Sequence, residues 1–89
     1  MTQPSWRLTW VSSAEKDFHR LPARHQSSIR KGAAALTVSP HAGPHIKKLR
    51  GELEGLYRLR LGDIRLVYRI VPQSREVRII AIGFRGGVY

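Results

Sequence analysis

Residues 56–71 read LYRLRLGDIRLVYRIV, with an apolar side chain at every second position on both sides of Gly62-Asp63. A period of two is typical of β-strands that bury one face and expose the other. Gly-Asp between two such runs is typical of a tight hairpin turn. The stretch therefore predicts two antiparallel strands, over residues 56–61 and 64–71, with one apolar face and one basic face.

A third strand is expected after this hairpin. Pro72 to Ser74 predict a second turn, and residues 76–84, EVRIIAIGF, are rich in the β-branched residues that strands favour. Three consecutive strands joined by short turns predict an antiparallel meander in the carboxyl-terminal half of the chain.

The beginning of the chain predicts a strand and a short helix. Residues 5–11, SWRLTWV, alternate aromatic and β-branched residues with polar ones, and both tryptophans fall on one face, where core packing is favoured over base stacking. Ser12 with Glu15 three places later is a capping-box pattern, which predicts that a helix begins there. Pro22 is expected to stop it.

A second helix is expected over residues 23–38, with Pro22 at its start. Its buried face is predicted from apolar residues at helical spacing, namely Ile29, Ala33 and Leu36. Residues 39–45, SPHAGPH, hold two prolines and a glycine, so we expect a loop between the helices and the strands.

The order strand, helix, helix and three strands predicts an α+β fold in a single domain over residues 1–89. We expect a small antiparallel sheet of about four strands, with an amino-terminal helical hairpin packed on its apolar face. A chain of 89 residues has the usual length of one domain with one hydrophobic core.

Composition restricts the class of protein. Lys and Arg number 16 against 6 Asp and Glu, and the formal net charge of +10 favours nucleic acid or an acidic protein as partner. The lack of cysteine excludes disulfides, zinc–thiolate sites and thiol nucleophiles, and fits a reducing compartment. No stretch approaches the roughly 18 apolar residues of a membrane span, so we expect a cytoplasmic protein without a membrane partner.

Arginines alternate with the apolar residues of the predicted hairpin. Arg58 and Arg60 lie two residues apart on one strand, so both face away from the core, and the partner strand adds Arg65 and Arg69. One exposed arginine fits an ordinary solvated strand, but several on one face repel one another. Asp63 is the one acid that we expect in these strands to offset them. The cluster therefore predicts a bound polyanion.

Other polar side chains carry weaker predictions. With Arg69, the loop residues Lys47, Lys48 and Arg50 fit contacts with phosphates of messenger or ribosomal RNA, although a plain solvated loop explains them nearly as well. The histidines have no acid or cysteine at metal-ligand spacing, so we expect surface positions, no metal and no other cofactor. They are His19, His25, His41 and His45, of which the last two lie in a loop that could approach the arginines.

Two stretches resemble a known family. Residues 49–70, LRGELEGLYRLRLGDIRLVYRI, and residues 82–89, IGFRGGVY, closely resemble the RelE/ParE superfamily of toxin–antitoxin toxins. In that family a strand with alternating basic residues precedes a Gly-Asp-x-Arg hairpin, and a final strand ends in a basic motif before Val-Tyr. The resemblance implies a RelE-like fold. From the ribonuclease branch it implies a metal-independent, ribosome-dependent endoribonuclease that cuts messenger RNA in the ribosomal A site.

The resemblance also implies a reaction and its catalytic residues. A 2′-hydroxyl of the RNA attacks the neighbouring phosphate to give a 2′,3′-cyclic phosphate, and arginines stabilise the charge of the transition state. The family's residues map onto Arg58, Arg60, Arg65, Arg85 and Tyr89, with the tyrosine expected to orient the base by stacking. Arg58 stands where many members have lysine, and a guanidinium is a poor general base, so the proton acceptor stays open.

Departures from the family pattern keep other functions open. Gly86-Gly87 replace part of the basic ending, so a member with weak activity that acts mainly in a repressor complex with its antitoxin is one alternative. A DNA gyrase inhibitor of the ParE type is the other, although the full arginine and tyrosine set favours RNA. The expected partners are a cognate RelB-like antitoxin, messenger RNA and the ribosome, with a monomer alone and a hetero-oligomer with the antitoxin.

Overall fold

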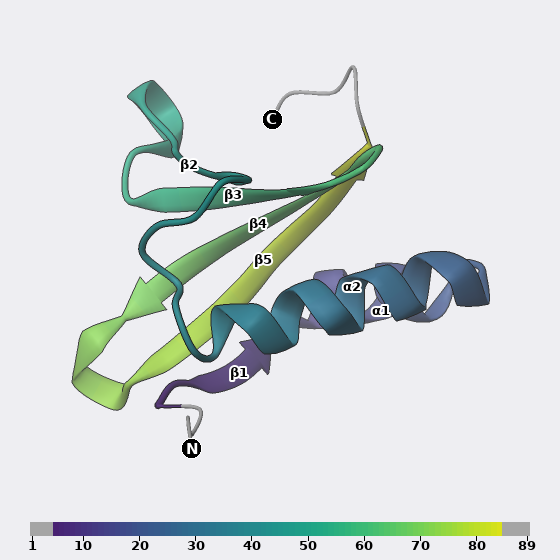
Figure 1. Cartoon of the computed structure of the whole chain (residues 1–89), viewed down its shortest axis with the longest axis horizontal. Helices are drawn as coiled ribbons and strands as arrows, with labels where there is room; N and C mark the ends of the chain where they lie inside the picture. The colour runs from purple at the N-terminus through teal and green to yellow at the C-terminus, as the bar shows by residue number, and fades with distance from the viewer. Residues whose placement is uncertain (1–4, 85–89) are drawn as a thin grey trace.

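The computed structural model describes residues 5–84, in which two helices pack on one face of a five-stranded sheet (Figure 1). The helices are α1 (Ser12–His19) and α2 (Ala23–Leu36). The strands are β1 (Arg7–Trp10), β2 (Ile46–Lys48), β3 (Leu56–Leu61), β4 (Ile64–Val71) and β5 (Glu76–Phe84), with 3-10 turns at Gly51–Leu53 and Pro72–Ser74. The predicted α+β class, helical hairpin and three-stranded meander are confirmed. Neither helix of the described part is long and apolar enough to cross a membrane.

The sheet is mixed rather than antiparallel throughout. Its order is β1-β5-β4-β3-β2, and β1 runs parallel to β5, with Arg7 opposite Glu76. The remaining neighbours are antiparallel. Parallel strands need a long crossover connection, and the helical hairpin lies between β1 and the meander in the chain, as Figure 1 shows. The expected antiparallel sheet of about four strands is corrected to a mixed sheet of five.

The strand that the sequence did not predict is β2. It has three residues, Ile46 to Lys48, and pairs along β3 at the edge of the sheet. A single apolar residue followed by two lysines shows no measurable alternation, so the period-two rule cannot detect it. Edge strands of this kind are commonly short and rich in lysine, which discourages pairing with other chains.

Helix α1 begins at Ser12 itself, so the predicted capping box is wrong. The N-cap residue is Val11, in an extended conformation, and its side chain has no polar atom with which to cap the helix. The helix begins here because the backbone of Val11 is still held in the sheet, where its amide donates to the carbonyl of Ile79 at 3.0 Å. Helix α2 ends at Leu36, two residues before the predicted end.

The hydrophobic core lies between the helices and the sheet. Its fully buried members come from the predicted apolar positions of α2, β4 and β5, and include Ile29, Leu36, Leu66, Tyr68 and Ile79. Both tryptophans pack against this core as expected. The backbone of α2 approaches β3 closely at Gly32, where a Cβ atom would lie 2.8 Å from the Cδ atoms of Leu61. A glycine at this position therefore sets the spacing between α2 and the strand that carries Arg58 and Arg60.

Candidate functional site

Basic side chains gather on the side of the sheet that faces away from α1 and α2. Opposite residues in a sheet point to the same side, and successive residues point to opposite sides. Arg60 lies opposite Arg65, Arg58 lies opposite both Lys47 and Val67, and Arg69 lies opposite Arg78. Core residues such as Leu59 and Leu66 alternate with them. We call the surface formed by Lys47, Arg58, Arg60, Arg65, Arg69 and Arg78 the arginine face.

The arginine face consists of successive cross-strand rows. The row nearest the β3–β4 turn holds Arg60 and Arg65, the next holds Lys47 and Arg58, and the last holds Arg69 and Arg78. Neighbouring rows are about 6.5–7 Å apart along a strand, and opposite Cβ atoms lie about 4.5–5.5 Å apart. Guanidinium groups from three strands can therefore reach one chain of phosphates.

A polar hollow opens at the turn end of the arginine face. Its volume is about 620 Å³. The hollow is lined by His45, Arg60, Leu61, Gly62, Asp63 and Arg65. Gly62 adopts a φ of +63°, which the tight turn requires and which glycine adopts without strain. One terminal nitrogen of Arg65 donates to the carbonyl oxygens of Gly62 at 2.7 Å and Ile64 at 3.2 Å, so the turn holds this guanidinium at the hollow.

Arg58 lies in the middle row with its side chain half-buried. Its Nε atom is buried and has no hydrogen-bond acceptor within residues 5–84. A buried donor without an acceptor costs about 1–3 kcal/mol, and native proteins rarely leave one unsatisfied. An anion bound on the arginine face would supply the acceptor.

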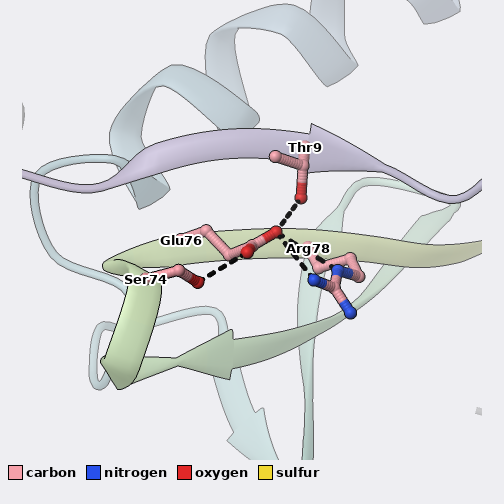
Figure 2. Close-up of polar contacts among 4 residues, drawn as sticks. All are labelled: Thr9, Ser74, Glu76 and Arg78. Carbon is pink, nitrogen blue, oxygen red and sulfur yellow. Dashed lines mark hydrogen bonds and ion pairs between the residues drawn. The ribbon is translucent and has the colours of Figure 1, made fainter.

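Glu76 is a buried acid at the far end of the arginine face, and Figure 2 shows its contacts. The Ser74 and Thr9 hydroxyls each donate to its carboxylate at 2.6 Å, and Arg78 donates from Nε at 3.2 Å and pairs with it at 3.1 Å. These hydrogen bonds, with Ser74 first, lower the pKa of Glu76 to about 2, against the opposing effect of burial.

This carboxylate corrects the expectation that Asp63 is the one acid of these strands. Glu76 offsets the charge of Arg78, whereas Arg58, Arg60 and Arg65 lie in the two rows nearer the turn. The turn end of the arginine face is therefore the end better suited to an added anion.

The remaining predicted residues are distributed as follows. Lys47 and Arg69 belong to the arginine face, but Lys48 lies opposite Tyr57, on the side of the core, and Arg50 is exposed before the first 3-10 turn. The predicted residues Arg85 and Tyr89 lie outside the described residues. The rings of His19, His25 and His41 contact Phe18, Phe84 and Trp6. Within residues 5–84 no group of acids and histidines could hold a metal ion.

Arg78 was not singled out from the sequence, and His45 was named there only as a residue of a loop that could approach the arginines. Arg78 joins Arg69 only through the register of β4 and β5, which contains a bulge between Val67 and Tyr68 that shifts the alternation. His45 comes next to Arg60 because its carbonyl accepts a 2.9 Å hydrogen bond from the Arg60 amide, which extends the unpredicted pairing of β2 with β3.

Two apolar hollows open elsewhere. One of about 520 Å³ lies between β1, α1 and α2, around Trp10 and Phe18. The other, of about 320 Å³, lies between α2, the loop before β2, and β3. Their apolar linings do not suit a polyanion, so the arginine face is the candidate nucleic-acid interface.

Comparisons with known proteins agree with this fold. Residues 8–89 match the family model described as ParE toxin of type II toxin-antitoxin system, parDE. Toxin RelG of Mycobacterium tuberculosis is 31% identical over 86 residues, which cover 94% of this chain and 95% of the relative. Toxin RelE of the same organism is 35% identical over 85 residues, covering 94% and 86%. The crystal structure of the toxin-antitoxin complex RelBE2 from that organism aligns with a TM-score of 0.81 and 30% identity, over 91% of this chain and 99% of that one.

Proposed function

Because the chain belongs to the ParE toxin family, within the RelE/ParE superfamily of type II toxins, we propose that it is a metal-independent endoribonuclease that cleaves messenger RNA in the ribosomal A site. The protein is a toxin of a toxin–antitoxin system, and its partner is a cognate antitoxin. The proposal adds messenger RNA and the ribosome as partners, and it places the action in the cytoplasm.

The observation that carries the proposal is the buried Nε of Arg58, beside the row of Arg60 and Arg65. A donor that lacks an acceptor within residues 5–84, placed among like charges, suits a ligand that brings negatively charged oxygens. A phosphate of RNA brings two such oxygens and replaces the water that the guanidinium groups lose.

The reaction follows from these donors. The 2′-oxygen of the RNA forms a bond to the adjacent phosphorus, the bond from phosphorus to the 5′-oxygen breaks, and a 2′,3′-cyclic phosphate and a 5′-hydroxyl result. Negative charge grows on the non-bridging oxygens in the transition state. Arg60 and Arg65, already held by the hairpin, stabilise that charge without reorganising.

Other predicted residues complete the proposal. Arg85 adds a further donor, and Tyr89 orients the nucleotide by stacking on its base. Lys47 and Arg69 bind flanking phosphates on the arginine face, and Lys48 and Arg50 bind ribosomal RNA beyond it. These contacts give affinity that falls with rising salt concentration.

The test compares the wild type with an Arg60→Ala, Arg65→Ala double variant, each induced in growing cells, by mapping the 5′ ends of translated messages. We expect cuts within codons for the wild type and their loss in the variant. An Arg24→Ala, Lys31→Ala double variant removes the same charge from exposed positions of α2 and is expected to cut like the wild type. Thermal unfolding checks that all three proteins fold.

The matching family model is described as a ParE toxin. The resemblance to the ParE branch implies a second function, inhibition of DNA gyrase. Intact messages together with accumulated cleaved DNA–gyrase complexes would replace our proposal with that one. Growth unaffected by any of the three proteins would instead favour a member that acts only in a repressor complex with its antitoxin.

A further inference from the structure

The proposed cleavage needs a group that accepts the proton of the attacking 2′-hydroxyl. A guanidinium keeps its proton and cannot serve as a general base. The basic residues around the turn, Arg58, Arg60 and Arg65, are all arginines. The acceptor must therefore come from another side chain near them.

His45 lies at this place. Ile46 is opposite Leu59 in the antiparallel ladder, so His45 continues the pairing opposite Arg60, whose amide donates to the His45 carbonyl at 2.9 Å. Arg60 is in turn opposite Arg65. His45, Arg60 and Arg65 thus form one row across three neighbouring chain segments, and all three line the polar hollow.

The loop before β2 is anchored on both sides of its turn. The buried Tyr68 hydroxyl donates to the carbonyl of Pro40 at 2.7 Å, and the Ile46 amide donates to the carbonyl of Gly43 at 3.2 Å. With the bond from Arg60, these contacts fix the backbone of His45, while the residue itself stays exposed. An exposed imidazole on a fixed backbone can reach a ligand in the hollow.

The titratable and charged groups that line the hollow with His45 are Arg60, Asp63 and Arg65. General-base catalysis is most effective when the base has a pKa near the working pH. Imidazoles as a class change charge between pH 5 and 8, whereas ordinary carboxylates titrate near pH 4. Of the two kinds of base in the hollow, the imidazole is the better matched.

We propose that His45 is a catalytic residue that accepts the 2′-hydroxyl proton in the hollow between Arg60 and Arg65. The proton passes to the unprotonated ring nitrogen as the bond to phosphorus forms, and the departing 5′-oxygen takes a proton from water. The imidazolium then returns its proton to solvent. This inference rests on the proposed endoribonuclease function.

The experiment measures single-turnover cleavage on purified ribosomes that hold a defined message with an empty A site, from pH 5.5 to 8.5. We expect His45→Gln to lower the rate by about 10²- to 10⁴-fold and to remove the rise of the rate with pH. The affinity for ribosomes whose message carries a 2′-deoxy nucleotide at the cleavage site should differ by less than about twofold between His45→Gln and the wild type. The reason is that the variant loses no charge of the arginine face. Added imidazole should restore part of the rate of His45→Gly.

Two variants serve as controls. His41→Gln changes a histidine of the same loop whose ring contacts Trp6, and it should leave rate and pH profile unchanged. Asp63→Asn tests the other base of the hollow and should keep the rise of the rate with pH. A wild-type rate and profile for His45→Gln, or loss of the rise in Asp63→Asn instead, would overturn the role of His45. A wild type that cuts no message would refute the endoribonuclease function itself.

Discussion

Replacing Tyr68 by phenylalanine tests the anchor that holds the loop of His45 to the sheet. Tyr68 is fully buried at the centre of β4, and its hydroxyl donates to the buried Pro40 carbonyl at 2.7 Å. Phenylalanine keeps the ring and its stacking on Tyr57, whose ring centroid lies 5.6 Å away. The substitution therefore removes one hydrogen bond and leaves one buried carbonyl without its donor.

The size of the effect follows from that carbonyl. Leaving a buried acceptor unsatisfied costs about 1–3 kcal/mol of unfolding free energy. For a domain of this length each kcal/mol lowers the melting temperature by about 4–8 °C. We expect Tyr68→Phe to melt about 4–24 °C below the wild type.

Urea unfolding followed by circular dichroism measures the difference. The midpoint should fall while the denaturant slope stays constant, because the surface exposed on unfolding is nearly unchanged. Tyr57→Phe is the matched control, since it removes a hydroxyl from the other ring of the stacked pair and should cost less than about 0.5 kcal/mol. Equal midpoints for Tyr68→Phe and the wild type would refute the anchoring role of this hydrogen bond.

The same bond predicts a dependence on high pH. Burial, with a smaller effect of Tyr57, raises the pKa of Tyr68 above its ordinary value of 10.0. Above pH 10 the unfolded chain loses the phenolic proton that the folded protein retains, so stability falls as pH rises further. Tyr68→Phe has no phenolic proton at this position, so its stability should fall less above pH 10 than that of the wild type.

Three further predictions concern the site. Arg58→Met should abolish cleavage yet raise the unfolding free energy by about 1 kcal/mol, because it removes the unsatisfied buried Nε; a less stable variant in urea would contradict this. Glu76 has a folded pKa of about 2 against an ordinary 4.5, so the stability that it adds is present above pH 4.5 and lost as pH falls toward 2. The melting temperature of Glu76→Gln should vary less with pH across that window than the melting temperature of the wild type. Parallel curves of melting temperature against pH for the two proteins would argue against the assigned contacts. Gly62→Ala places a side chain at φ +63° in open space, so it should lower the unfolding free energy by about 1–2 kcal/mol through backbone strain alone. Thermal unfolding measures this loss, and an unchanged melting temperature would count against a strained turn.

The hairpin and the helices could be predicted from the sequence because each follows a single period over many residues. Alternation identified β3 and β4, and helical spacing identified the buried face of α2. The short β2 and the parallel placement of β1 depend on contacts between distant segments. Local pattern contains no information on either, since an edge strand of three residues has too few positions to show a period.

The same division applies to the candidate site. Pleating was enough to place Arg58 and Arg60 on one face, and the hairpin register added Arg65. His45 reaches Arg60 through the pairing of β2 with β3. Glu76 pairs with Arg78 of its own strand and accepts a hydrogen bond from Thr9 of β1. The sequence therefore predicted the charges and left His45 in a loop that could approach them, but it did not predict the contacts of Glu76.

The pairing of β1 with β5 also affects how the chain folds. These strands are separated by about seventy residues, so the parallel edge of the sheet closes a long loop and belongs to the contacts that slow folding. During synthesis β1 leaves the ribosome long before its partner exists, whereas the helical hairpin can form from local contacts. We therefore expect β1 to join the sheet late, after β5 has been synthesised.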